Sequence, residues 1–102
     1  MTFLNFTPHA ICLNDGRCFE SCGVARVASS HTEIIGDICS VVYGEIEGLP
    51  EPRENTMYIV SAMVLSASNR KDLVAPASGH PDTVRNEKGH IVSVPCFIRG
   101  TL

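Results

Sequence analysis

The sequence lacks a basic excess, a long hydrophobic run and an export signal. Its 102 residues carry 8 Lys and Arg against 11 Asp and Glu, a net charge of −3. General nucleic-acid binders show a clustered basic surplus, so duplex nucleic acid is excluded as a partner. No apolar run reaches the roughly 18–20 residues that cross a bilayer, and the opening residues lack the basic and apolar stretches of a signal peptide. We therefore expect a cytoplasmic protein with no membrane partner.

The cysteine pattern is not that of a secreted disulfide scaffold. The five cysteines, at positions 12, 18, 22, 39 and 96, are an odd number that cannot all pair within one chain. Secreted scaffolds usually show an even number at tight spacing. Most of the five have apolar neighbours, and free cysteine is commonly buried as a small hydrophobe. We predict that all five thiols are reduced, as a cytoplasm keeps them.

Length and a hydrophobic content of 44% indicate one domain, residues 1–102, which can bury roughly 60–65% of its unfolded surface. The Asn-Asp-Gly-Arg turn at 14–17 predicts a hairpin between strands 9–13 and 18–20, because Asp-Gly between apolar stretches is a strong hairpin signal. A second hairpin is predicted between 82–85 and 90–94.

Further strands are predicted at 24–28, 38–46, 57–60, 72–75 and 96–99, with a loop or hairpin end over 29–37. Ser61 is a good N-cap for the only expected helix, residues 62–68. That helix is short and apolar almost all round, which predicts burial. The expected fold class is α+β, a mostly antiparallel small β-sheet or open barrel of about seven short strands with one short helix.

Motifs for metal, cofactor and catalysis are missing. Structural zinc needs two close Cys/His pairs, but only Cys18 and Cys22 stand close together. No Gly-x-Gly-x-x-Gly fingerprint occurs, and no cysteine stands at a helix N-terminus that would activate it. Glu45 and Glu47 lie on one face of a strand, which is more typical of a solvated edge than of an acid/base couple. We expect no cofactor, no metal and no catalytic residue.

Charge is segregated along the chain in a way that favours an anionic ligand. Residues 33–54 hold six acids and one base, whereas residues 70–102 hold five bases and three acids. Six of the eight bases are arginines, whose planar fork matches phosphate. The loop 75–81 and the start of the helix add hydroxyls and backbone amides.

A pocket for such a ligand needs cations, hydrogen-bonding groups and a stacking ring. Arg26, Arg85 and Arg99 are predicted to hold phosphates, while a tyrosine stacks on a base. Lys71 and Lys88 are expected to be solvated surface charges. The predicted ligand-binding residues are Thr7, His9, Arg26, Tyr43, Tyr58, Ser61, Ser78, Gly79, His80, Arg85 and Arg99.

Six segments together resemble a family of small proteins encoded in tailed-phage and prophage genomes. They are NFTPHAI at 5–11, SxGVARV at 21–27, YGEIEGLPEP at 43–52, TxYIVS at 56–61, RxDLVAP at 70–76 and VRNEKGHI at 84–91. The resemblance implies an accessory protein that counters host defence. By analogy with the anti-Thoeris and anti-CBASS sponges, it implies sequestration of a nucleotide immune signal.

The expected function is therefore to bind and sequester a small anionic nucleotide-type signal, cyclic ADP-ribose-like or a cyclic oligonucleotide, without catalysis. Such a site should be buried and preformed, and a homo-oligomer would let two protomers both supply arginines. One alternative is inhibition of a host protein through the acidic loop 45–54. Another is a small nucleotide hydrolase with His9 or His80 as base.

Overall fold

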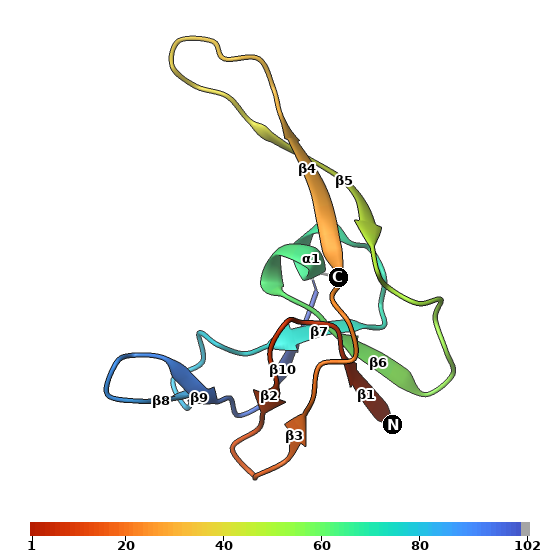
Figure 1. Ribbon diagram of the computed structural model, residues 1–102, viewed down its shortest axis with the longest axis vertical. Coiled ribbons are helices and arrows are strands. Elements are labelled where there is room, and N and C mark those ends of the chain that lie inside the picture. Colours follow the sequence, from red (N-terminus) through yellow and green to blue (C-terminus); the bar gives the residue numbers. More distant parts are fainter. Residues whose placement is uncertain (101–102) are drawn as a thin grey trace.

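The computed structural model describes residues 1–100, and residues 101–102 lie outside the described part of the chain. Within it, ten short strands and one short helix form an α+β fold (Figure 1). The predicted class is confirmed, with ten strands rather than about seven. The elements are β1 (Thr2–Asn5), β2 (Ile11–Cys12), β3 (Cys18–Phe19), β4 (Arg26–His31), β5 (Val41–Glu47), β6 (Thr56–Ile59), α1 (Ala62–Ala67), β7 (Leu73–Pro76), β8 (Val84–Arg85), β9 (Ile91–Ser93) and β10 (Phe97–Arg99).

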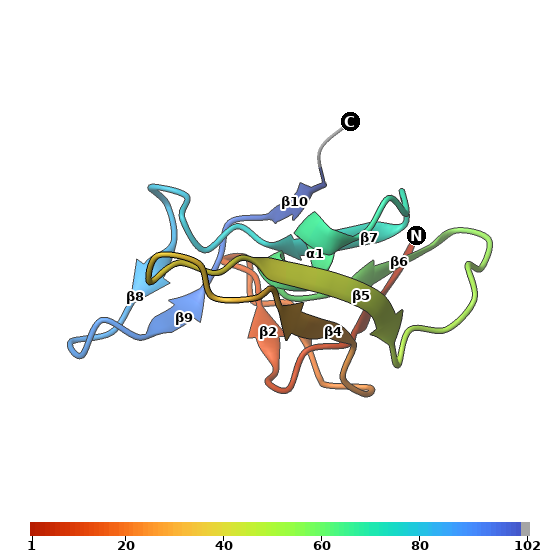
Figure 2. The same cartoon turned by 90° about the horizontal axis from the view of Figure 1, so that it is seen from above.

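A four-stranded sheet in the order β1-β6-β7-β10 forms the body. β1 and β7 both run parallel to β6, and β10 is antiparallel to β7. The three remaining pairs, β2–β3, β4–β5 and β8–β9, are antiparallel hairpins, so antiparallel pairing predominates as predicted. Figure 2 shows the β8–β9 hairpin at one side of the body and the 48–55 loop at the other.

β6 is buried on both faces, which explains the unbroken apolar run Met-Tyr-Ile of the strand and the Val60 that follows it. Tyr58 and Val60 belong to one core cluster, together with Val64 and Leu65 of α1. Met57 and Ile59 face the opposite side, because neighbouring strand residues alternate. There Phe3, Phe19 and Phe97 close a second core, with ring centroids 5.1–5.9 Å apart.

The helix begins as predicted, since the hydroxyl of Ser61 accepts a hydrogen bond from the Val64 amide at 3.3 Å. The expectation of full burial is wrong. Only Val64 and Leu65 are buried, while Met63 is 58% exposed. α1 packs against β7 of the sheet and also lies beside β4 and β5 (Figure 1).

The β4–β5 hairpin, residues 26–47, projects from the body as an arm (Figure 1). Its register pairs Arg26 with Glu47 and His31 with Val41. At its end Ile35 and Ile38 exchange two backbone hydrogen bonds across Gly36 and Asp37. Both turn residues have positive φ, the backbone that a tight hairpin turn requires. The hairpin end predicted within 29–37 is therefore present, but residues 29–31 still belong to β4, so the prediction started it too early.

The prediction that all five cysteines are reduced is wrong. Cys12 and Cys18 form a disulfide across the β2–β3 hairpin, where they are register partners. Cys22, Cys39 and Cys96 are free and exposed. An odd number excludes complete pairing but not one pair, and the pairing of 12 with 18 follows from the hairpin that brings them together.

Alkylation of the denatured, unreduced protein is expected to modify three cysteines. After the mass of three alkyl groups is subtracted, the protein should be two mass units lighter than the fully reduced chain, because the disulfide lacks two hydrogens. Intact-mass analysis measures this directly. Because the bridge closes a short loop, reduction should lower the free energy of unfolding by about 2 kcal/mol. Five modified cysteines in protein purified without reductant would contradict the pairing.

Candidate functional site

A cavity of about 400 Å³ lies beside the start of α1, between the turn after β1 and the β9 strand. It is termed the first cavity below. Its walls are mostly apolar, and Thr7, His9, Ser61 and Ser78 of the predicted site line it. The remaining lining residues are Ala10, Ile11, Cys12, Ala62, Pro76, Ile91, Val92, Ser93 and Val94.

The turn that brings Thr7 and His9 to the first cavity is held by Asn5, a residue that the sequence prediction missed. Asn5 is fully buried, and its side-chain amide donates to the carbonyls of His9 at 2.8 Å and Phe19 at 2.9 Å. Its oxygen accepts from the backbone amide of Thr7 at 2.9 Å and from the Thr7 hydroxyl at 2.7 Å. The only signal in the sequence is a polar residue at the end of an apolar run, which does not distinguish a buried residue from a turn.

Two predicted ligand contacts have structural roles of their own. The Thr7 side chain is buried, and its hydroxyl lies within hydrogen-bonding distance of Asn5 and of the His9 carbonyl. The Ser61 hydroxyl caps α1. His9 and Ser78 are exposed and lie at the cavity with no such bond from their side chains among the described residues. They are therefore the polar groups best placed to meet a ligand.

Arg85 does not line the first cavity itself. It lies in a neighbouring open hollow with Lys88 and His90, and it contacts the first cavity through the Ser78 carbonyl. Its guanidinium donates to the carbonyls of Ser78 and Gly89, each at 3.1 Å. These two bonds hold a planar group that has five N–H donors, so three remain for another acceptor. Lys88 lies in the turn that follows, where its backbone amide bonds to Asn86.

The rest of the loop 77–83 has its own internal bonds. The Nδ1 atom of His80 accepts from the backbone amide of Asp82 at 3.0 Å. Gly79 is exposed, and a Cβ there would meet nothing within 4 Å among the described residues. A side chain at position 79 would meet no obstruction, so glycine is not required there.

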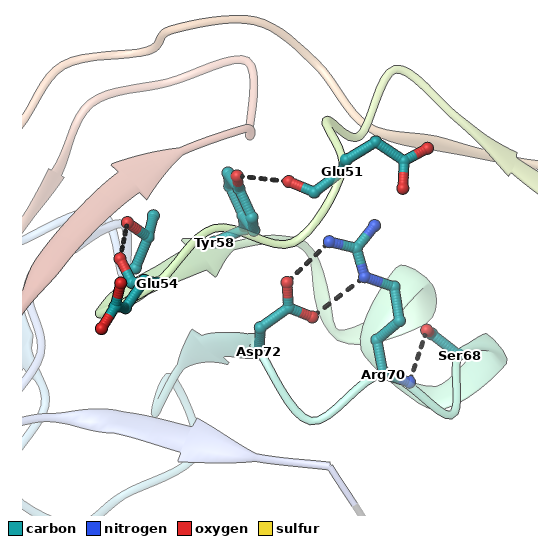
Figure 3. A network of polar contacts seen from close by, with 7 residues as sticks. Glu51, Glu54, Tyr58, Ser68, Arg70 and Asp72 are labelled. Atoms are coloured by element: carbon teal, nitrogen blue, oxygen red, sulfur yellow. Dashed lines mark hydrogen bonds and ion pairs between the residues drawn. The ribbon is translucent and has the colours of Figure 1, made fainter.

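Arg99 lies at a second cavity of about 400 Å³, at the opposite end of α1, together with Arg70 and Lys71. Arg70 forms a two-point ion pair with Asp72, at 2.9 and 2.6 Å, above the ring of Tyr58 (Figure 3). The hydrogen-bonded Asp72 carboxylate raises the pKa of Arg70. Arg70 therefore holds the start of β7 against β6 instead of lying free in solvent.

Both tyrosines and Arg26 lie away from the first cavity. Tyr58 is fully buried in the core, and its hydroxyl donates to the Glu51 carbonyl at 3.0 Å (Figure 3). It cannot stack on a ligand without unpacking the sheet, so that predicted role is corrected. Tyr43 lies on the arm, at a smaller hollow beside α1. Arg26 is opposite Glu47 at the base of the arm.

Comparison with protein-family models, curated proteins and solved structures finds no match for this chain. Across residues 1–100 no three metal-ligating side chains gather in one place. The same residues contain no helix with the length and apolar character needed to span a membrane. The candidate site therefore rests on the geometry alone: the first cavity, its polar lining residues and the buried Asn5 that holds the adjacent turn.

Proposed function

We propose that this protein binds and sequesters a small anionic nucleotide-type signal in the first cavity, without chemical change to it. The signal is cyclic ADP-ribose-like or a cyclic oligonucleotide, and the setting is the cytoplasm of an infected bacterium. The observation that carries the proposal is an apolar cavity of about 400 Å³ lined by His9 and Ser78, with the Arg85 guanidinium bonded to the Ser78 carbonyl beside it. Apolar walls with a few convergent polar groups are the usual form of a small-molecule site.

Each part of such a ligand has a matching surface. The apolar walls suit a nucleobase, while the Ser78 hydroxyl and the His9 ring hydrogen-bond to a base or ribose. Arg85 supplies a fixed guanidinium for a phosphate, and charge-assisted bonds of this kind are about twice as strong as neutral ones. No cofactor is needed for binding alone.

The segments that resemble phage proteins also support this location. Four of the six, at 5–11, 56–61, 70–76 and 84–91, each contribute residues to the wall of the first cavity. These segments are separated in the sequence and come from different elements of the fold. Their convergence on one cavity favours a shared binding role.

A depletion assay tests the proposal. Purified protein is incubated with cyclic ADP-ribose isomers and cyclic oligonucleotides, and the free ligand is measured after filtration. One ligand is expected to be depleted in proportion to protein and recovered intact after the protein is denatured by heat. Recovery of a cleaved product would identify a hydrolase instead, and depletion of none would contradict the proposal.

Arg85→Ala is expected to weaken binding of the depleted ligand by roughly 10- to 150-fold, because one charge-assisted bond is lost. Arg85→Lys should lose much of the same affinity, since a point charge does not reproduce the fork. Lys88→Ala, three residues away, should change affinity less than about threefold. Calorimetry measures all three, with melting curves to show that each variant is folded.

Arg99→Ala is the control for location, because Arg99 lies at the second cavity. It is expected to leave affinity within about threefold of the parent protein. If Arg99→Ala abolishes binding while Arg85→Ala does not, the ligand occupies the second cavity and the assignment to the first is wrong.

A second candidate function is inhibition of a host protein through the acidic segment 45–54. Glu45, Glu47, Glu51 and Glu54 are all exposed, and none joins the three ion pairs found within residues 1–100. They are therefore available to a basic partner. Two results together would favour this function. The parent protein would deplete no ligand, and changing these four residues to Gln would abolish its effect against host defence.

A further inference from the structure

The molecule exposes more surface than a compact monomer of its size. A globular monomer of 11.0 kDa exposes about 5,600 Å², whereas this chain exposes 7196 Å². The radius of gyration is 15.3 Å, against about 13 Å for a compact domain of 100 residues. The surplus of about 1,600 Å² for one chain is about twice the roughly 800 Å² that each partner buries in a standard protein interface.

The arm carries apolar side chains to its end. Ile34, Ile35 and Ile38 are 71–74% exposed, and Val41 and Val42 follow them along β5 with about half of their surface exposed. An isolated two-stranded hairpin is marginally stable in water. An apolar cluster of this kind on a projecting hairpin is typical of an interaction surface.

A second exposed apolar surface lies on the β8–β9 hairpin, residues 84–93. Val84, Ile91 and Val92 are 45–54% exposed there. The hairpin projects from the body at a different place from the arm (Figures 1 and 2). Each copy of the chain therefore presents two separate apolar surfaces, one on the arm and one on this hairpin.

The two surfaces carry opposite charges. The arm tip, residues 31–41, contains Glu33 and Asp37 and no Lys or Arg. The β8–β9 hairpin contains Arg85 and Lys88 against Glu87, with His90 beside them. Complementary charge around apolar contacts fixes the partner and its orientation.

We propose that the arm tip of one copy packs on the β8–β9 hairpin of a second copy, and that the second copy returns the contact to give a symmetric dimer. A reciprocal pair of contacts closes under a two-fold axis and leaves no free arm to extend a chain of molecules. Ile91 and Val92 also line the first cavity, so the partner's arm lies along one wall of that site. The docking does not depend on the ligand and is tested without it.

Sedimentation equilibrium of the full chain is expected to give twice the 11.0 kDa mass of the protomer. Ile35→Asp on the arm and Val92→Asp on the hairpin should each raise the dimer dissociation constant by roughly 30-fold or more, because each places a charge in an apolar contact. Met63→Asp is the matched control. Met63 is as exposed and apolar, but it lies on α1, outside both surfaces, so its change should leave the dimer intact.

Mixing the two disrupted variants tests which surfaces meet. In a mixed dimer the intact arm of the Val92→Asp copy faces the intact hairpin of the Ile35→Asp copy. One of the two contacts is thereby restored, and a dimer should reappear on mixing. A monomeric parent protein, a dimer that survives either substitution, or a mixture that stays monomeric would overturn the proposal.

Hydrogen exchange of the parent protein provides a second measurement that needs no variant. Amides of the arm tip should become better protected between about 1 and 100 µM protein, because association is concentration-dependent. The amides of β6 should not change, because that strand is already buried within one copy. Arm-tip exchange that is independent of concentration would also overturn the proposal.

Discussion

Asn5→Asp is expected to lower the free energy of unfolding by about 3–5 kcal/mol at neutral pH, because it places an unpaired charge in the core. The carboxylate would still accept from Thr7, but it has no N–H for the carbonyls of His9 and Phe19, which the Asn5 amide meets at 2.8 and 2.9 Å. Those two oxygens would instead face a negative charge. This is a large part of the 5–15 kcal/mol by which domains are usually stable.

The loss should depend on pH in a defined direction. Burial raises the pKa of the introduced Asp in the folded state above its unfolded value of about 3.9. The folded state then binds more protons, so the stability of the variant falls as pH rises between those two values. The variant should therefore be closer to the parent protein near pH 4 than at pH 7.

Urea unfolding at the two pH values measures both effects. Asn69→Asp is the control, because Asn69 is exposed, and a surface change of this kind is usually within about 0.5 kcal/mol. Equal losses for Asn5→Asp and Asn69→Asp would show that the buried amide network does not hold the turn after β1.

Gly48→Ala is expected to cost about 2–5 kcal/mol of unfolding free energy, the second large effect. Gly48 has a φ of +89°, and a Cβ there would collide with the backbone carbonyl of Val24. The left-handed backbone costs an L-residue about 1–2 kcal/mol, and relief of the collision requires a backbone shift of about 1–3 kcal/mol more. The nearest atoms are the carbonyl oxygen and carbon of Val24, which belong to the backbone. No flexible side chain can therefore move aside to relieve the collision.

Gly16→Ala separates the two contributions. Gly16 has a φ of +97°, yet in the described structure nothing lies within 4 Å of its Cβ position. It should therefore show only the backbone cost of about 1–2 kcal/mol. Denaturant midpoints with unchanged slopes measure both variants, and equal losses would mean that the Val24 contact contributes nothing.

Local signals in the sequence predict the hairpins and the helix start well. The Asn14–Arg17 turn and the Ser61 cap each act within a few residues, and both occur as predicted. β1 was missed because Thr2–Asn5 is short and has no flanking turn signal. It forms a strand because it pairs in parallel with β6, which lies more than fifty residues later in the sequence.

The candidate site was predicted less completely, for a similar reason. Thr7, His9, Ser61 and Ser78 do converge on one cavity, because the short turns near them fix their positions. Tyr58 was predicted to stack on a ligand, but a tyrosine in a strand buried on both faces has no access to one. The positions of Arg26, Tyr43 and Arg99 depend on how separate elements pack, which residue type and spacing do not determine.

The pairing of β1 with β6 determines the order in which the molecule is built. Thr2 is in register with Thr56, and Asn5 with Ile59, so the first strand has no partner until well over half of the chain has been synthesised. The β2–β3 and β4–β5 hairpins close over short spans and can form while the chain is still emerging. Contacts between residues far apart in the sequence form slowly, because the intervening chain must first be ordered. We therefore expect the β1–β6 pairing to form after the β2–β3 and β4–β5 hairpins.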